Sequence, residues 1–230
     1  RTMMDAARIY DEPRYQAAAE KAGQFILLAQ MPDPQPAWAQ QYNEQMHPAW
    51  ARKFEPPSVT GGESQGVMSI LIELYEQTGN RKFLEPIPRA IKYLRSSLRT
   101  DGRLARFYEL RTNKPLYFTK DYKLTYADDD MPTHYAFIVS SRLDSIERRY
   151  AGALNSKWTA PKLKEISKRP VRNARQQQQT QTVIQSLDSR GAWVDEGTLR
   201  YQEGPANERV IRCQTFIQNL NVLSQYMGSE

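Results

Sequence analysis

The sequence predicts a mainly helical protein of stacked helical hairpins that carries one small β-hairpin. Apolar residues recur every three or four positions along most of the chain, which is the period of a helix with one buried face. One helical pattern occurs twice at a constant offset, and the matching positions are Tyr15 and Phe83, Ala22 and Ala90, Phe25 and Tyr93, and Ile26 and Leu94. Because one hairpin cannot bury its apolar face alone, we expect neighbouring hairpins to stack.

The first half of the chain contains three expected helices, over residues 14–30, 63–77 and 81–98. Pro13 suits the first turn of the first helix, and the prolines after residue 31 prevent its continuation. Residues 31–61 therefore form a long irregular segment. Gly79 ends the second helix, and Pro86 either lies in the first turns of the third helix or kinks it.

The second half begins with alternating residues over 103–110 and 115–126, which predict a hairpin around the turn at 112–114. Helices are expected over 135–154, 161–185 and 208–227, with a short extended piece at 191–194. Cys213, inside the last helix, is expected to be a small buried apolar residue. We expect one domain over 1–230, with a surface excursion over 155–180 around a basic stretch. The first residues read as the inside of a helix, so we expect residues upstream of Arg1.

Composition excludes several classes of protein. The chain has 230 residues, 40% of them hydrophobic and 25% charged, which is typical of a globular protein. One cysteine and two histidines exclude a disulfide framework and a multi-cysteine zinc site. The sequence has neither a standard glycine-rich phosphate loop nor a Gly-x-Ser-x-Gly nucleophile turn. A net charge of +6 favours an anionic partner, which leaves nucleic acid, a membrane surface or an acidic sugar.

The irregular segment 31–61 holds the densest set of candidate binding residues. It contains the aromatic residues Trp38, Tyr42 and Trp50, the amides of residues 40 and 41, and Arg52 beside a lysine. Aromatic faces stack on sugar rings, while amides and guanidinium groups bond to hydroxyls and carboxylates. The structural alternative is a tryptophan-rich loop that packs over the ends of helices.

Charged residues beyond this loop allow two interpretations each. Glu63 either faces a ligand or closes a capping box with Ser58 or Thr60. The hairpin cations, together with Arg52, either bind carboxylates or form a solvated face. The acidic run 128–130 either ligates calcium, which prefers oxygen ligands, or forms a turn before Pro132.

At this loop the sequence resembles the pectate lyases of polysaccharide lyase family ten. Three blocks carry the resemblance, and their order matches the family over about residues 10–125. The first block runs over 38–64 and matches at 38–42, 51–57 and 61–64; the second is 105–115 and the third is 119–121. In the third block Lys120 stands in place of the family's usual arginine. The resemblance implies an (α/α) toroid with short β elements. It also implies calcium-assisted anti β-elimination on polygalacturonate.

The resemblance assigns a role to individual residues. Arg52 would be the catalytic arginine, Arg106 and Lys120 the cations that bind carboxylates, and Trp38 the sugar platform. We add Gln41, Tyr42 and Glu63 as expected substrate contacts. Because arginine is almost always protonated, Arg52 is easier to explain as an electrostatic clamp than as a Brønsted base.

Two departures from the family affect these expectations. Lysine at position 120 cannot offer the bidentate geometry of arginine. The family's calcium-binding aspartates lie upstream of the first block and have no counterpart here, so either the chain is a fragment or the metal site is lost, and the metal ligands stay unassigned.

The sequence therefore predicts a carbon–oxygen lyase that cleaves an acidic polyuronate with calcium as cofactor. We expect a secreted, periplasmic or cell-surface monomer that neither inserts into membranes nor binds nucleic acid. The alternatives are a non-catalytic toroid protein that binds acidic glycans and a helical repeat that binds nucleic acid. The aromatic residues and cations are concentrated around one loop, which argues against the nucleic-acid alternative.

Overall fold

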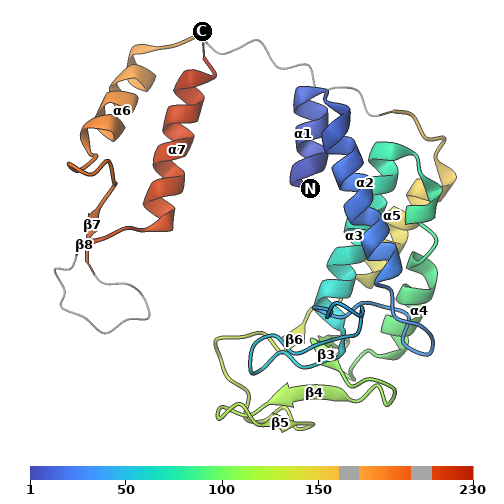
Figure 1. The fold of residues 1–230 in the computed structure, drawn as a ribbon. Coiled ribbons are helices and arrows are strands. Elements are labelled where there is room, and N and C mark those ends of the chain that lie inside the picture. The colour runs from blue at the N-terminus through green and yellow to red at the C-terminus, as the bar shows by residue number, and fades with distance from the viewer. Residues whose placement is uncertain (161–170, 198–208, 230) are drawn as a thin grey trace. The chain divides into compact units, whose positions relative to one another are not determined.

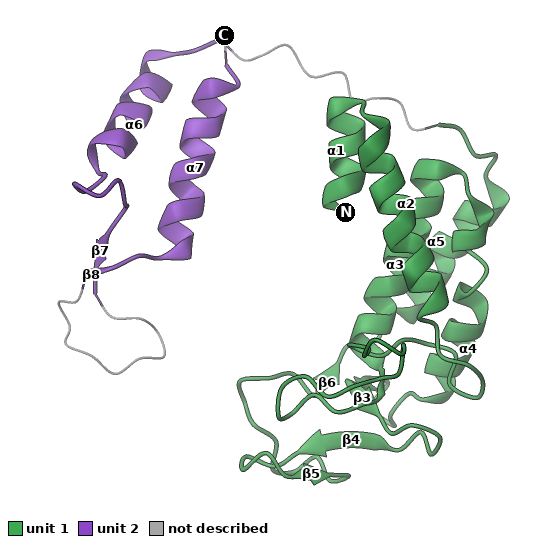
Figure 2. Cartoon of the chain, in the orientation of Figure 1, with its two compact units in different colours: residues 1–163 green, residues 164–230 purple. Residues whose placement is uncertain are grey.

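The structure is a computed structural model that describes residues 1–160, 171–197 and 209–229. The chain divides into two compact units, residues 1–163 and 164–230 (Figure 2). The single domain predicted over 1–230 stays a prediction. The surface excursion predicted over 155–180 includes residues 161–170, which lie outside the described residues, and its last part belongs to a helix.

Unit 1 is a group of helices with small antiparallel sheets at one end (Figure 1). Its helices are α1 (Thr2–Tyr10), α2 (Pro13–Leu28), α3 (Gly61–Thr78), the 3₁₀ turn η1 (Arg81–Phe83), α4 (Ile87–Ser96) and α5 (Leu143–Asn155). Its strands are β1 (Val59–Thr60), β2 (Leu104–Ala105), β3 (Phe107–Tyr108), β4 (Pro115–Phe118), β5 (Leu124–Thr125) and β6 (Ile138–Val139). No helix in the described residues is long and apolar enough to cross a membrane.

Helix α3 lies at the centre of unit 1 and contacts α2, α4 and α5. Met68, Leu71 and Ile72 are fully buried, because neighbouring helices cover α3 on more than one side. Gly79 ends α3 in the left-handed region, at φ 71°, and its N–H donates to the carbonyl of Tyr75 at 2.7 Å. The predicted end of this helix is confirmed.

The predicted hairpin is confirmed as the pair β3 and β4, and it belongs to a larger sheet of order β1-β3-β4-β5. Strand β1 pairs with β3 through Val59 opposite Tyr108 and Thr60 opposite Phe107. The N–H of Gly61 then donates to the carbonyl of Arg106 at 2.9 Å. This pairing brings the first turn of α3 beside residue 106.

A second small sheet joins β2 to β6, with Ala105 opposite Ile138. The N–H of Arg106 donates to the carbonyl of Phe137 at 2.7 Å, so residues 135–139 run beside the hairpin. The helix predicted over 135–154 begins only at Leu143 for this reason. Its first residues, including the aromatic Tyr135 and Phe137, pack against the sheet instead.

The predicted (α/α) toroid of helical hairpins is wrong. The described residues form seven α-helices and several small sheets, divided between two units, and residues 97–142 form strands and loops between α4 and α5. The helical repeat also fails in packing, because Tyr93 is 6% exposed whereas its counterpart Phe25 is 51% exposed. The same spacing of apolar residues therefore occurs in two helices with different surroundings.

Other helix boundaries differ from the prediction for local reasons. Instead of one helix over 81–98, the structure has η1 followed by α4. Pro86 and Pro88 have no backbone N–H to donate, so they interrupt the helix, and α4 starts at Ile87 between them. Asn80 caps η1 by accepting a hydrogen bond from the N–H of Lys82 at 3.2 Å.

Unit 2 contains two helices, α6 (Ala174–Gln185) and α7 (Cys213–Met227), and the strand pair β7 (Asp195–Glu196) and β8 (Arg209–Val210). Of the helix predicted over 161–185, residues 161–170 lie outside the described residues, and a capping box between Asn173 and Gln176 starts α6. The helix predicted from 208 starts at Cys213, which is exposed rather than buried as predicted.

Candidate active site

The guanidinium of Arg52 forms an ion pair with the carboxylate of Glu55, three residues later in a tight turn. The turn is closed by the N–H of Glu55, which donates to the carbonyl of Arg52 at 2.9 Å. The side chain of Arg52 is 60% exposed, whereas that of Glu55 is only 4% exposed. A fixed, buried carboxylate therefore holds a guanidinium that still faces solvent.

This pair changes the acidity of both groups. The hydrogen bond from Arg52 lowers the pKa of Glu55 from 4.5 to about 2. The same bond raises the pKa of Arg52 above its ordinary value, because it favours the protonated guanidinium. The arrangement supports an electrostatic clamp at position 52 and opposes a role as Brønsted base.

Two more side chains donate to Glu55. The hydroxyl of Tyr135 donates to Oε1 at 3.0 Å, and the amide Nε2 of Gln40 lies 3.2 Å from the same oxygen. Gln40 Nε2 also lies 3.2 Å from the hydroxyl of Tyr135. Burial raises the pKa of Tyr135, so its hydroxyl keeps the proton that it donates.

Arg106 approaches the same tyrosine from the hairpin. Its guanidinium carbon lies 4.6 Å from the ring centre of Tyr135, and that of Arg52 lies 5.4 Å from it. Arg106 also donates to Glu63 Oε1 at 2.5 Å and to the carbonyl of Ala136 at 2.6 Å. The structure therefore brings Arg52, Arg106 and Glu63 together around Tyr135.

Glu63 does not form the capping box that was its structural alternative. Thr60, the residue before α3, makes no side-chain cap, and its hydroxyl donates to the carbonyl of Trp38 at 3.0 Å. The second carboxylate oxygen of Glu63, Oε2, is buried without a hydrogen-bond partner in the described part of the chain. Glu63 is thus free to hold Arg106 at the start of α3.

Lys120 lies apart from this cluster, in the turn between β4 and β5. It pairs with Asp130 at 3.2 Å, and both side chains are exposed. Tyr122 in the same turn stacks on Phe54, with ring centres 5.5 Å apart, and so connects the turn to the loop of Arg52. No contact places Lys120 itself beside Arg52 or Arg106 within the described residues.

Trp38 is buried, with 2% exposure, and its indole N–H donates to the carbonyl of Ile26 at 2.8 Å. Its backbone N–H donates to the hydroxyl of Ser64 at 3.0 Å, which ties the loop to α3. The alternative of a loop packed over helix ends therefore describes Trp38 better than an open sugar platform does.

Gln41 and Tyr42 also make internal contacts. The side-chain amide of Gln41 donates to the carbonyl of Ala49 at 2.6 Å. The hydroxyl of Tyr42 donates to the carbonyl of Ala29 at 2.6 Å. Burial raises the pKa of Tyr42 to about 12. With Trp38, these residues line a pocket of about 370 Å³.

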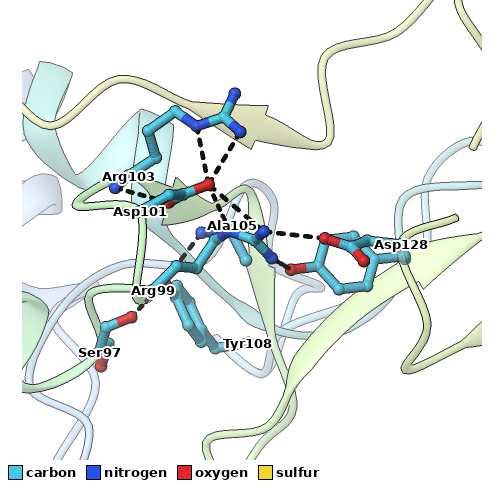
Figure 3. A network of polar contacts seen from close by, with 8 residues as sticks. Ser97, Arg99, Asp101, Arg103, Ala105, Tyr108 and Asp128 are labelled. Atoms are coloured by element: carbon cyan, nitrogen blue, oxygen red, sulfur yellow. Dashed lines mark hydrogen bonds and ion pairs between the residues drawn. The ribbon is translucent and has the colours of Figure 1, made fainter.

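A second network of charges lies beside the site and involves the acidic run 128–130. Arg99 lies between Asp101 and Asp128 and donates to Asp128 at 2.8 Å, while Arg103 pairs with Asp101 at 2.8 Å (Figure 3). Arg99, Arg103 and Asp128 line a groove of about 570 Å³ that Tyr135 also lines.

The described residues do not fit the expected calcium ion. Asp128 is paired with Arg99, and Asp130 is paired with Lys120. Within residues 1–160, 171–197 and 209–229, no group of three or more His, Cys, Asp and Glu side chains is arranged to hold a metal.

Sequence reasoning missed two members of the cluster, Glu55 and Tyr135, and named Gln40 only as one of the amides of the loop. Gln40 and Glu55 lie inside the block that carried the resemblance, so their place in the sequence was a usable signal. Tyr135 lies in a stretch that was assigned to a helix, and only the pairing of β2 with β6 brings it to Arg106.

Residues 3–102 match the family model described as pectic acid lyase. The resemblance to the pectic acid lyases is confirmed. The matched residues include Trp38, Gln41, Tyr42, Arg52 and Glu63, whereas Arg106 and Lys120 lie beyond them.

A family 10 polysaccharide lyase from Cellvibrio cellulosa is similar to this chain in structure, with a TM-score of 0.54 and 20% sequence identity. The match covers 66% of this chain and 58% of that protein, so the chain spans a little over half the length of the solved lyase. At this identity the match shows similarity of fold alone. No curated protein matches the chain.

Proposed function

We propose that this pectic acid lyase-type chain acts in a polysaccharide lyase that cleaves an acidic polyuronate such as polygalacturonate by anti β-elimination. The observation that carries the proposal is the pair of guanidinium groups, Arg52 and Arg106, gathered over one tyrosine ring. The match of residues 3–102 to the pectic acid lyase model supports the lyase class.

The difficult step of the reaction is loss of the proton next to the uronate carboxylate. A hydroxide ion from solvent takes the proton and becomes water, and negative charge develops on the carboxylate as the C–H bond breaks. The electron pair then forms the double bond as the C4 oxygen leaves, and that oxygen takes a proton from water. Preorganised guanidinium donors lower the free energy of such a transition state. Arg52, exposed and held by Glu55, is the residue that we assign to this charge.

Arg106 is assigned to orientation of the carboxylate. Its side chain is 19% exposed and is fixed by Glu63 and the Ala136 carbonyl, so little conformational entropy is lost on binding. Lys120, exposed on the neighbouring turn, is assigned to an adjacent sugar unit. Calcium assistance remains an expectation of the resemblance. Action outside the cytoplasm and a monomeric state are part of the proposal.

A second candidate is a protein that binds acidic glycans without cleaving them. Two observations favour it: the three predicted cations are each paired with a carboxylate, and the hydrogen bond to Glu55 raises the pKa of Arg52. Such a protein has the charges to bind a polyanion but lacks an evident proton acceptor.

The two candidates are separated by incubating the full chain with polygalacturonate and recording the ultraviolet absorbance of the conjugated product, with added calcium and with a chelator. Appearance of this product, and its loss in Arg52→Ala, supports the lyase. Retention on a polyuronate gel without product supports the binding protein, and absence of both contradicts the two candidates together.

A further inference from the structure

Tyr135 is the side chain that connects both site arginines to the buried carboxylate of Glu55. Its ring lies under the guanidinium groups of Arg52 and Arg106, and its hydroxyl donates to Glu55 Oε1 at 3.0 Å. The two arginines come from different parts of the chain, a loop before α3 and the hairpin that follows α4. No other side chain in the described residues contacts both guanidinium groups and Glu55.

The surroundings of Tyr135 restrict its movement. Its ring packs against Phe54 with the centres 4.8 Å apart and against Phe137 at 5.1 Å, and both phenylalanines are buried. The hydroxyl is fixed at the other end by Glu55, and by Gln40 at 3.2 Å. A ring fixed at both ends is a rigid support for the flexible side chains that lie on it.

Arg52 needs such a support because most of its side chain is in solvent. Its side chain is 60% exposed, and a long exposed side chain samples many rotamers unless neighbours restrict it. The rings of Phe54 and Tyr135 lie 5.1 and 5.4 Å from its guanidinium carbon, which suits the weak attraction of a cation for an aromatic face. The ion pair with Glu55 then sets its direction.

We propose that Tyr135 is a positioning residue that fixes the spacing of Arg52 and Arg106, so that both guanidinium groups reach one uronate carboxylate or two adjacent ones. The inference rests on the proposed function, because it assigns the arginines to an acidic sugar. Tyr135 also lines the groove of about 570 Å³ that contains Arg99 and Arg103.

The two parts of the tyrosine have separable roles. Tyr135→Phe keeps the ring under both arginines and removes the donor to Glu55, whereas Tyr135→Leu removes the ring as well. We expect kcat to fall about 10-fold in Tyr135→Phe with KM nearly unchanged, because direction is lost while binding charges remain. In Tyr135→Leu we expect kcat to fall by about 100-fold or more and KM to rise, because both cations lose their support.

Tyr122→Phe is the matched control. Tyr122 also stacks on Phe54, at 5.5 Å, but it contacts Lys53 rather than either site arginine. We expect kcat and KM of this variant to equal those of the wild type. The folded fraction of each variant is measured by circular dichroism, since a merely structural role lowers that fraction and leaves the constants per folded molecule unchanged.

If the wild type shows no turnover, the positioning role is tested by measuring the affinity for a short oligogalacturonate by calorimetric titration. In that case the lyase proposal fails, and the positioning role predicts a loss of affinity of about fivefold or more in Tyr135→Leu but not in Tyr122→Phe. If folded Tyr135→Leu has the same kcat, KM and affinity for the oligogalacturonate as the wild type, the positioning role is overturned. This holds whether or not the wild type is a lyase.

Discussion

The Arg52 guanidinium is bound to a carboxylate, that of Glu55, which is almost entirely removed from solvent. The carboxylate also accepts the backbone N–H of Arg52 at 3.2 Å, so one residue is held at both its main chain and its side chain. The charge at position 52 is thus fixed in place while remaining accessible. An exposed guanidinium with a fixed direction is what a site for carboxylates requires.

Arg52→Ala is expected to remove turnover of polygalacturonate without unfolding the protein. The loss of one preorganised donor to developing charge lowers kcat by about 10² to 10³-fold. The measurement is the rate of formation of the unsaturated product at saturating substrate, normalised to folded protein.

Arg8→Ala is the control for Arg52→Ala, because Arg8 and Asp5 form an ion pair at the same three-residue spacing on exposed α1. This variant is expected to keep the wild-type rate. Equal rates in the two variants would contradict the assignment of Arg52 to the reacting carboxylate.

Glu55→Gln is expected to lower stability in a pH-dependent manner. The pKa of Glu55 is lowered from 4.5 to about 2 in the folded protein, so the folded state favours the ionised form. The stability gained from this group is therefore fully present above pH 4.5 and is lost as the pH falls toward about 2. Urea unfolding of wild type and variant over this range measures the difference, which shrinks in acid.

Glu44→Gln, at an exposed position of the same loop, controls for the change in net charge. A difference between wild type and Glu55→Gln that stays constant down to pH 2 would mean that Glu55 is not the group that Arg52 holds ionised.

The sequence was sufficient for the helices that depend on local pattern. Helix α3 was predicted over 63–77 and observed over Gly61–Thr78, because its apolar period and the glycine that follows it are local signals. The start of α5 was missed, because residues 135–139 are ordered by pairing with β2, some thirty residues earlier in the chain. The ring of hairpins was wrong, since the spacing of apolar residues does not reveal which helices become neighbours.

The sequence predicts the charged residues of the site but not the contacts that join them. Arg52, Arg106 and Glu63 were named from the sequence, and the structure places them around Tyr135. Trp38 was assigned to sugar stacking by residue type and by the family resemblance, and its burial depends on contacts with Ile26 and Ser64 that neither of these reveals.

Gly61→Ala is expected to disturb the site through the backbone. A Cβ atom at this position would lie 2.3 Å from the carbonyl oxygen of Ala105 and 2.9 Å from Leu104 Cβ. Forcing this much overlap costs about 1–3 kcal/mol and displaces α3 from the strand beside Arg106. The free energy of unfolding measured in urea and the KM for polygalacturonate report the two effects.

Gly66→Ala, one turn further along α3, is the control for Gly61→Ala because a Cβ there meets no atom within 4 Å. Alanine is favoured over glycine in a helix, so this variant is expected to gain about 0.5–1 kcal/mol. Similar losses of stability at the two positions would contradict the close packing of α3 on β2.

Trp38→Phe is expected to destabilise the fold without a specific effect on sugar binding. The indole is 2% exposed, and its N–H satisfies the carbonyl of Ile26, so the change leaves that carbonyl without a donor at a cost of about 1–3 kcal/mol. Trp50→Phe, at a tryptophan that is 54% exposed, is expected to change stability by less than about 0.5 kcal/mol. Urea unfolding and titration with oligogalacturonate separate stability from binding. A Trp38→Phe protein of wild-type stability that binds the sugar more weakly would restore Trp38 as a stacking platform, and it would require the loop 31–61 to open when substrate binds.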